Sequence, residues 1–312
     1  MITLGDPRGI GPEVVTRALA SSAFPAEFLL IGPEGAMRPE GVAFESVGNW
    51  APGGPARLAG TLAGRAIERA VALILAGAAD ALVTAPIHKP ALRDAGYAWP
   101  GHTEMLRDLA EVPVTALCLA AERSAFGGPL RVVLVTGHIP LREVPGAVTE
   151  ARLVECGLLA RDGLRRGWAI EEPRLALCGL NPHASDGGLF GDEEARVFVP
   201  AMGALRRLGV AADGPIPADT AFVRAGRGEF DAVLAPYHDV GMAAIKSAAF
   251  GEAVNVTLGL PFPRTSPDHG TAFDIAGTGR ADPRSMARAI ALAVRFARRV
   301  PARAASIPSA RA

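Results

Sequence analysis

Six histidines could carry chemistry, because each lies beside glycine, proline, aspartate or threonine and not inside an amphipathic run. Three of them, His138, His183 and His238, each follow a separate apolar run that reads as a strand. Converging neutral imidazoles suit a divalent transition metal such as zinc, cobalt, manganese or iron(II). Their wide spacing is not a local ligand signature, so spacing alone favours ordinary structural histidines.

Two glycine-containing segments are candidates for anion binding. Residues 5–13 (Gly-Asp-Pro-Arg-Gly-Ile-Gly-Pro-Glu) precede a helical pattern, but they lack the Walker ending and the dinucleotide fingerprint, which favours a structural turn. Residues 101–104 (Gly-His-Thr-Glu) bring an imidazole and a hydroxyl to a predicted helix start, where capping is an equally good explanation. Lys246 lies in an apolar stretch, and it is either snorkelling to solvent or held in a site.

Acidic residues near the histidines have two interpretations. Asp219 and Asp239 could orient a histidine or serve as turn residues and caps, and for Asp268 the turn is favoured. The three cysteines do not resemble nucleophiles, and no Gly-x-Ser-x-Gly elbow is present. Chemistry based on a nucleophilic serine or cysteine is therefore not expected.

The composition excludes several classes of protein. The 312 residues are 49% hydrophobic, which is enough for a large core, and the 32 basic residues balance the 32 acidic ones. No bulk field therefore attracts nucleic acid or an anionic membrane. Three widely spaced cysteines favour a reducing compartment, which we expect to be the cytoplasm. Asp80 interrupts the longest apolar region, residues 70–85, so no membrane span is expected.

The elements that must position these side chains alternate along the chain. Strand-like runs recur at residues 28–31, 81–84, 131–136, 175–178, 232–235 and 253–258. Helical spacing appears at residues 58–76, 148–165, 193–208 and 283–299. Residues 301–312 are small, polar and basic, which predicts a frayed tail. This alternation predicts an α/β protein with a largely parallel sheet, whose ligands bind at the carboxyl ends of the strands.

Eight segments in order along the chain resemble the 4-hydroxythreonine-4-phosphate dehydrogenase family of vitamin B6 biosynthesis. That family includes relatives acting on 4-phospho-D-threonate or 4-phospho-D-erythronate, and the resemblance runs nearly end to end. The segments are residues 5–13, 86–89, 101–104, 179–184, 217–220, 237–239, 255–261, and 264–266 with 268–272.

The resemblance implies an isocitrate/isopropylmalate-dehydrogenase-like fold, with two α/β/α domains and the active-site cleft between them. Residues 1–125 plus 265–312 would form a discontinuous domain that carries the NAD-side loop. Residues 126–264 would form the central domain, with the metal ligands and the dimer contacts. The family is a homodimer with shared active sites, and its metal ligands map to His138, His183 and His238. The ion would be zinc, magnesium, cobalt or manganese, one per site.

The resemblance also implies ligand contacts. Those to a small phosphorylated hydroxy acid map to His102, Thr103, Lys246, Asn255 and Arg264.

The loop over residues 268–277 is similar to the adenine-side loop of isopropylmalate dehydrogenases. This similarity implies that NAD, or alternatively NADP, contacts His269, Gly270, Thr271 and Asp274.

The implied activity is oxidation of 4-phosphohydroxy-L-threonine to a 3-keto acid, which decarboxylates to 3-amino-2-oxopropyl phosphate. A metal on the substrate hydroxyl would stabilise the developing alkoxide as a Lewis acid. Lys246 and Asp239 are the candidate catalytic residues. Lys246 would take the hydroxyl proton, because desolvation and a nearby cation favour its neutral amine.

The chain departs from the family pattern close to the expected pocket. Arg8 replaces a small residue, Gly137 stands where threonine is common, and residues 247–252 differ. Pro263 and Pro267 also flank the arginine between them. Substrate identity is thus less secure than reaction type, and 4-phospho-D-threonate or 4-phospho-D-erythronate is the main alternative.

Three other activities are less favoured. Retention of residues 101–103, Asn255 and Arg264 argues for a phosphorylated substrate over a cis-dihydrodiol. A phosphate acyltransferase would leave the three histidines without a purpose. A non-catalytic metal-dependent sensor would bind substrate analogues without forming NADH.

Overall fold

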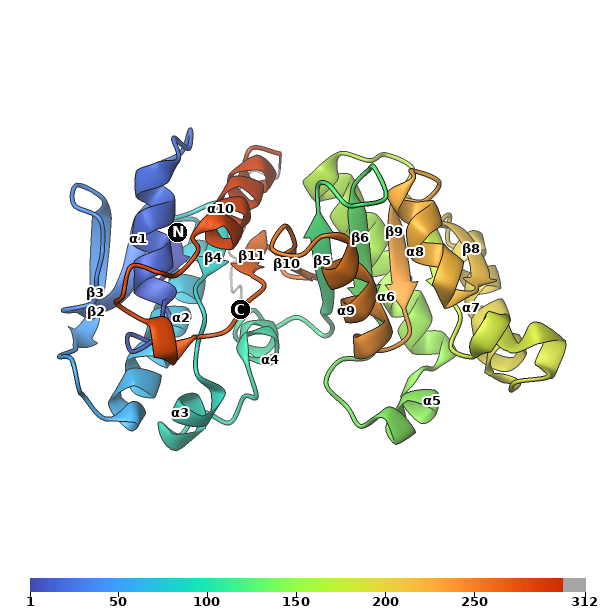
Figure 1. The fold of residues 1–312 in the computed structure, drawn as a ribbon, viewed down its shortest axis with the longest axis horizontal. Coiled ribbons are helices and arrows are strands. Elements are labelled where there is room, and N and C mark those ends of the chain that lie inside the picture. The colour runs from blue at the N-terminus through green and yellow to red at the C-terminus, as the bar shows by residue number, and fades with distance from the viewer. Residues whose placement is uncertain (300–312) are drawn as a thin grey trace, which may run out of the picture. The chain divides into compact units, whose positions relative to one another are not determined.

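The computed structural model describes residues 1–299 and divides the chain into two compact units. The first unit joins Met1–Pro113 to the segment that starts at Leu260, and the second is Val114–Gly259 (Figure 1). The tail predicted to fray, residues 301–312, lies outside the described residues.

The first unit contains a parallel sheet. Its strands follow the order β3 (Ala43–Asn49), β2 (Leu29–Glu34), β1 (Ile2–Thr3), β4 (Leu82–Thr84) and β11 (Arg264–Pro267). Its helices are α1 (Gly11–Ser21), α2 (Ala56–Leu75), α3 (Lys89–Asp94), α4 (His102–Leu109) and α10 (Arg284–Ala297), with the short turn η5 (Phe273–Ile275).

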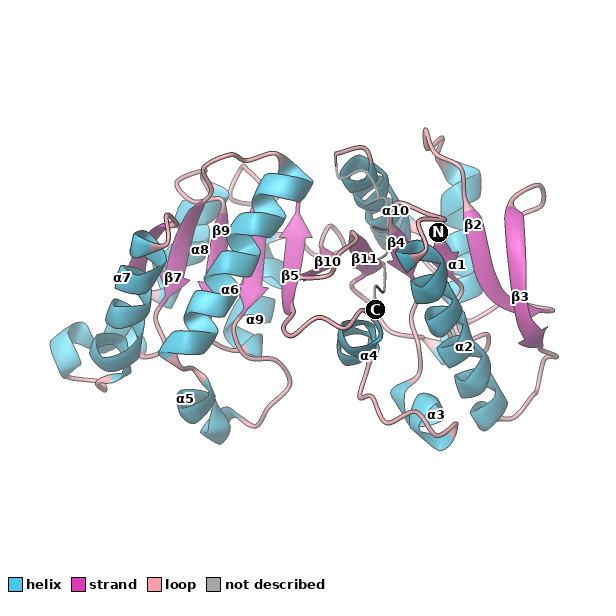
Figure 2. Ribbon diagram, turned by 180° about the vertical axis from the view of Figure 1, so that it is seen from behind, coloured by secondary structure: helices cyan, strands magenta, loops and turns pink. Residues whose placement is uncertain are grey.

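Helices cover both faces of this sheet. Figures 1 and 2 show α1 and α10 on one face and α2 and α4 on the other. The core under α2 gathers Ile67, Val71 and Ile74, whose spacing puts them on one side of a helix. Met105 and Leu106 bring α4 into the same core. The helix predicted over residues 58–76 is thus confirmed, and its apolar side packs against the sheet.

The second unit contains a mixed sheet. Its strands follow the order β10 (Val254–Leu258), β5 (Ala116–Ala121), β6 (Leu130–Leu134), β9 (Ala232–Ala235), β7 (Arg174–Cys178) and β8 (Ala211–Ile216). Its helices are α5 (Val144–Ala147), α6 (Glu150–Gly163), α7 (Val199–Arg207), α8 (Ala218–Gly226) and α9 (His238–Ala248), with the short turns η1 (Leu141–Glu143), η2 (Leu164–Trp168), η3 (Pro182–Gly188) and η4 (Glu194–Phe198). Helices α6 and α7 cover one face, and α8 and α9 cover the other (Figure 2).

Strand β5 departs from the expected parallel order, because it runs antiparallel to both β10 and β6. The connection from β5 to β6 contains only residues 122–129. A parallel crossover needs about a dozen residues or more, so this short loop leaves only the antiparallel arrangement. The mixed α/β class predicted from the sequence is confirmed.

Polar segments follow the carboxyl ends of β4, β6, β7 and β9, as the sequence predicted. Within residues 1–299, no helix is both long enough and apolar enough to cross a membrane.

Candidate functional site

Two of the predicted metal ligands line one pocket in the second unit. Strands β6 and β9 are parallel neighbours, and just after them the side-chain hydroxyl of Thr136 donates to the carbonyl of Pro236 at 2.8 Å. The segments that follow both strands therefore emerge together, and the ring centroids of His138 and His238 lie 4.8 Å apart. The pocket has a volume of about 430 Å³ and is lined by Gly137, His138, Ile139, Leu141, Val144, Tyr237, His238 and Asp239.

Asp239 orients one of these histidines. The Nδ1 atom of His238 lies 2.7 Å from the carboxylate Oδ1 of Asp239. Because an ionised carboxylate only accepts, Nδ1 donates this hydrogen bond, and Nε2 is the ring nitrogen left for another partner. This carboxylate–histidine pair is typical of metal-ligating histidines. The side chain of Asp239 is itself 87% exposed.

The departure at Gly137 is compatible with this pocket. A Cβ atom built there would meet no heavy atom within 4 Å. The glycine therefore leaves open space beside His138 where a threonine would fit, and no packing forces the change.

The third predicted ligand, His183, does not line this pocket. It lies in η3, where it is exposed and has a left-handed backbone with φ of 52°. Within residues 1–299, no group of three or more histidine, cysteine, aspartate or glutamate side chains is placed to hold a metal ion. The single chain therefore brings together two of the three predicted ligands.

Lys246 and Asn255 also belong to the second unit. Lys246 is half-buried in α9, seven residues after Asp239, and this spacing puts both side chains on the same side of the helix. Asn255 lies on β10 opposite Leu119 of β5 and is half-buried.

A buried cation lies in the first unit. Arg264 begins β11 and is only 3% exposed, and its guanidinium donates to the hydroxyl of Thr84 at 2.5 Å. Desolvation lowers the pKa of Arg264 to about 10. Even so, the side chain stays protonated at neutral pH. A guanidinium held in a fixed, buried position can bind the oxygen atoms of a phosphate or carboxylate through charge-assisted hydrogen bonds.

His102 is held neutral in the same unit. Its pKa lies well below the usual value because of desolvation first, and then because of the charges of Arg264 and Lys89. Its Nε2 atom is buried and has no hydrogen-bond partner among residues 1–299. His102 and Thr103 open α4, whose first backbone N–H groups also favour an anion.

Lys89 was missed as a site residue. A Cβ atom built on Gly101 would lie 3.4 Å from Cε of Lys89, so this lysine lies over the start of α4. It belongs to the segment 86–89 that carried the resemblance, and its position at the start of the short helix α3 was the available signal. Thr84 was missed as well, because a buried threonine at the end of a strand looks like ordinary core.

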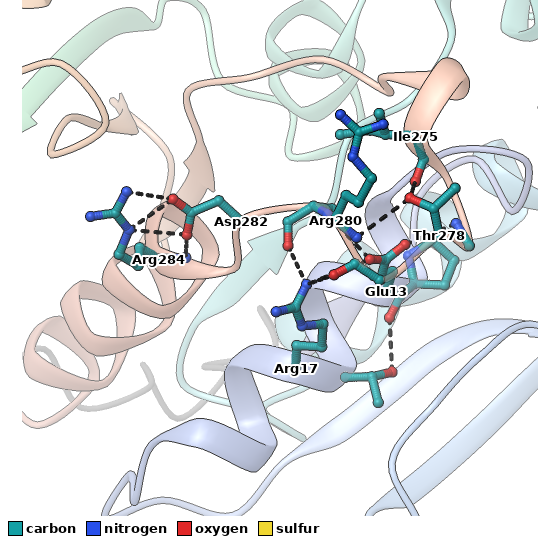
Figure 3. A network of polar contacts seen from close by, with 12 residues as sticks. Glu13, Arg17, Ile275, Thr278, Arg280, Asp282 and Arg284 are labelled. Carbon is teal, nitrogen blue, oxygen red and sulfur yellow. Dashed lines mark hydrogen bonds and ion pairs between the residues drawn. The ribbon is translucent and has the colours of Figure 1, made fainter.

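The predicted cofactor loop, residues 268–277, is anchored to α1. The buried carboxylate of Glu13 accepts from the backbone N–H of Gly277 at 2.8 Å and from that of Ala281 at 3.3 Å. Figure 3 shows Glu13 and Arg17 close to Thr278 and Arg280. Arg17 donates to the carbonyls of Gly279 and Ala281 at 2.7 and 2.6 Å. This network fixes the chain directly after the predicted cofactor residues.

The predicted contacts themselves are partly accessible. Nδ1 of His269 lies 3.0 Å from the carbonyl of Gly270, and Nε2 of the same ring is buried with no partner in the described part of the chain. Gly270 and Asp274 are exposed, whereas the Thr271 carbonyl accepts from Ile10 at 2.9 Å. The loop therefore exposes the backbone of Gly270 and the carboxylate of Asp274, while the imidazole nitrogen that has no partner is buried.

Arg8 packs the turn at residues 5–13 against this loop. Its guanidinium binds both carboxylate oxygens of buried Asp6, at 3.0 and 2.7 Å. The Arg8 Cζ atom lies 5.0 Å from the ring centroid of Phe273, and the His88 ring lies against the same phenyl. Because the carboxylate of Asp6 balances the charge of Arg8, this arginine stabilises the turn. It does not make residues 5–13 an anion-binding site.

The cysteines are not placed for nucleophilic chemistry. Cys118, Cys156 and Cys178 are free and buried. Burial raises the pKa of Cys118 and Cys178 to about 12, so almost no thiolate exists at neutral pH.

Comparison with known proteins decides the family. A family model described as "Pyridoxal phosphate biosynthetic protein PdxA" matches residues 16–293. The chain belongs to the PdxA family. It is 44% identical to the 4-hydroxythreonine-4-phosphate dehydrogenase of Paracoccus denitrificans, over 96% of this chain and 98% of that protein.

Two solved structures are similar to this chain. The 4-hydroxythreonine-4-phosphate dehydrogenase of Klebsiella pneumoniae matches with a TM-score of 0.84 and 40% identity, over 95% of this chain and 97% of that one. A terephthalate 1,2-cis-dihydrodioldehydrogenase from Burkholderia xenovorans matches with a TM-score of 0.68 and 27% identity, over 94% and 96%. The family named from the sequence motifs is thus confirmed.

Proposed function

We propose that this member of the PdxA family is a dehydrogenase that oxidises 4-phosphohydroxy-L-threonine with NAD and a divalent metal. The product, a 3-keto acid, would lose carbon dioxide to give 3-amino-2-oxopropyl phosphate. The observation that carries this proposal is the pair His138 and His238, whose rings line one pocket while Asp239 orients the second ring.

The donor set fits a divalent metal. Nδ1–H of His238 is directed to a carboxylate, which leaves Nε2 free to ligate, and two neutral imidazoles do not reduce the charge of a cation. A divalent cation, when bound, would supply positive charge for the oxygen of the substrate hydroxyl. We propose His138, His238 and His183 as its ligands, with zinc, magnesium, cobalt or manganese as the ion.

We propose that His183 comes from the partner in a homodimer with shared active sites. Within its own chain His183 is exposed and lies outside the pocket. Beside it, Leu189 is 72% exposed and Phe190 is 45% exposed. Exposed apolar side chains of this size mark surfaces that other chains cover.

The loop at residues 268–277 fits NAD or NADP. The buried Nε2 atom of His269 needs a partner, and Gly270 leaves its backbone open. NAD, when bound, would accept a hydride from the carbon that carries the substrate hydroxyl. We propose His269, Gly270, Thr271 and Asp274 as its contacts.

The substrate's anionic groups would meet the chain's own cations. Arg264 supplies a fixed, buried positive charge, and Thr103 supplies a hydroxyl at the first turn of α4. His102 stays neutral and can therefore share a hydrogen bond without competing with Arg264 for the anion. We further propose Asn255 as a substrate contact and Lys246 as the base that takes the hydroxyl proton.

Relatives with different substrates define the alternatives. Retention of residues 101–103, Asn255 and Arg264 supports a phosphorylated compound over a cis-dihydrodiol. Oxidation of 4-phospho-D-threonate or 4-phospho-D-erythronate is the second candidate, because the same phosphate contacts would serve it.

Two further properties belong to this proposal. The isocitrate/isopropylmalate-dehydrogenase type of two-domain fold is the one we propose for the chain. The cytoplasm is the compartment we propose, and the three buried free thiols are compatible with reducing conditions.

A substrate panel tests the function. The purified protein is incubated with NAD and zinc, magnesium, cobalt or manganese, and NADH absorbance is followed with 4-phosphohydroxy-L-threonine, 4-phospho-D-threonate and 4-phospho-D-erythronate. We expect the highest kcat/KM for the first compound and loss of turnover after chelation. Binding of all three compounds without NADH would instead indicate a sensor, and acyl-phosphate turnover would indicate an acyltransferase.

A further inference from the structure

The segment that carries His183 has an unusual backbone. Five consecutive residues, 183–187, have φ values of 52°, 53°, 72°, 45° and 69°. Only the last is glycine, and a side chain makes the left-handed conformation unfavourable because Cβ approaches the next carbonyl oxygen. Such a run persists only where surrounding contacts hold it.

Glu194 supplies those contacts. Its carboxylate Oε1 accepts from the backbone N–H groups of Leu180 at 2.8 Å and Asn181 at 2.7 Å. Its Oε2 accepts from the side-chain amide of Asn181 at 2.9 Å and from the hydroxyl of Ser185. Four donors from one short segment therefore meet on one carboxylate.

The carboxylate is buried and ionised. Glu194 is 3% exposed, and Ser185 is buried beside it. Burial alone would raise the pKa of Glu194, but hydrogen bonds from Asn181 and Ser185 outweigh it, so the pKa lies below its usual value. A charge held in this way is strongly bound to its donors.

Close packing also limits other positions for the turn. A Cβ atom on Gly179 would lie 3.1 Å from Cα and Cβ of Ala184 and 3.4 Å from Oε1 of Glu194. The turn thus lies directly against the end of β7, with Ser185 directed inward and His183 exposed.

We propose that Glu194 is a positioning residue for His183, whose carboxylate holds residues 180–185 in the left-handed turn that presents this imidazole at the surface. The part of the proposal that concerns metal ligation rests on the proposed function. The part that concerns the backbone does not.

An isosteric change separates the charge from the shape. In Glu194→Gln, one carboxylate oxygen is replaced by an amide NH2 group, which donates and cannot accept. The two donors that bonded to that oxygen therefore lose their acceptor. Glu193→Gln is the matched control, because within residues 1–299 Glu193 accepts from the Asn181 side chain, at 2.7 Å, and an amide oxygen can replace it there.

Hydrogen exchange of the metal-free full chain reports on the turn. In Glu194→Gln, we expect exchange at the amides of Leu180 and Asn181 to be about tenfold faster or more, and unchanged in Glu193→Gln. Unchanged exchange in a folded Glu194→Gln would overturn the proposal. If that variant does not fold, Ser185→Ala removes one donor only. Ser185→Ala should then show a smaller acceleration of hydrogen exchange in the same segment. Unchanged exchange in Ser185→Ala would equally overturn the proposal.

Zinc titration against a chelator reports on His183. We expect Glu194→Gln to bind zinc about tenfold to a hundredfold more weakly, as seen when partners of a ligand are lost, with Glu193→Gln like the wild type. Faster exchange with unchanged zinc affinity, where His183→Ala does lose zinc, would show that the turn does not position the ligand. If His183→Ala also keeps its zinc, the proposed metal site fails, and exchange alone decides the role of Glu194.

Discussion

Arg264 combines burial with a positive charge, because only 3% of it is exposed and its guanidinium stays protonated at neutral pH. Desolvation lowers its pKa to about 10, and its guanidinium donates to the hydroxyl of Thr84. A fixed, buried guanidinium of this kind is suited to the phosphate contact that we propose for it.

Arg264→Lys should test the recognition of phosphate. A lysine keeps the charge but loses the planar fork that binds two oxygens, so we expect KM for the phosphorylated substrate to rise about tenfold or more. KM for NAD should change little. Arg107→Lys is the control, because Arg107 lies on α4 with its guanidinium on Asp108 at the surface. An unchanged KM in Arg264→Lys would contradict the anion role.

His102 should make stability depend on pH. Its folded-state pKa is depressed by burial, then by Arg264 and Lys89, while the unfolded chain keeps the usual value of 6.5. As pH falls below 6.5, the unfolded state binds a proton that the folded state does not, so stability falls. From about pH 7 to about pH 5.5, this histidine should cost about 1 kcal/mol in the free energy of unfolding.

His102→Gln should remove that part of the loss, because a glutamine does not titrate. The measurement is urea unfolding of both proteins across this pH range. Parallel stability curves for the wild type and His102→Gln would show that the imidazole is not held neutral.

At the scale of elements, the ends of helices and strands carry most of the candidate site. His102 opens α4, His238 opens α9, and Arg264 opens β11. Helix starts present free N–H groups and strand ends release the chain into loops, so these positions combine fixed backbone with accessible side chains.

Ala169 gives a prediction about one such end. It follows η2 with φ of 55° and ψ of 40°, and its N–H donates to the carbonyl of Arg165 at 3.1 Å. Glycine adopts this left-handed capping conformation without the Cβ penalty, and the side chain is exposed. Ala169→Gly should therefore raise the free energy of unfolding by about 0.5 to 1 kcal/mol.

Denaturant unfolding checks this value, with Ala291→Gly as the control. Ala291 is exposed inside α10, where glycine should instead lower stability by about 1 kcal/mol. Destabilisation by both changes would argue against the left-handed cap at Ala169.

At the scale of the whole molecule, the main question is which chain supplies each histidine. His138 and His238 come together within one chain, whereas His183 is exposed outside their pocket. If the active site is shared between subunits, two inactive variants should restore activity when they are combined in a heterodimer.

A heterodimer of His183→Ala with His238→Ala should recover about half of the wild-type activity, because one of its two sites draws only on intact histidines. Differently tagged chains can be co-expressed, purified as the heterodimer and assayed for NADH formation. The heterodimer of His138→Ala with His238→Ala should stay inactive, because both of those residues come from the same chain. Inactivity of the first heterodimer would place all three ligands in one chain.

Local pattern determined much of this protein. Apolar runs and helical spacing located β4, β6, β7, β9, α2 and α10. They could do so because the spacing of apolar residues within one segment is enough to distinguish a helix from a strand. The motifs that carried the family resemblance were also local. The antiparallel strand β5 was not predicted, since its run of alanine, leucine and cysteine has no clear period.

Only the tertiary structure decided which distant residues meet. His138 and His238 are a hundred positions apart in the chain, and they meet because β6 pairs with β9. The buried charge of Arg264, the neutrality of His102 and the left-handed turn before Glu194 depend on long-range packing in the same way. Strand order and desolvation arise from contacts between segments far apart in sequence, and a local pattern does not contain them.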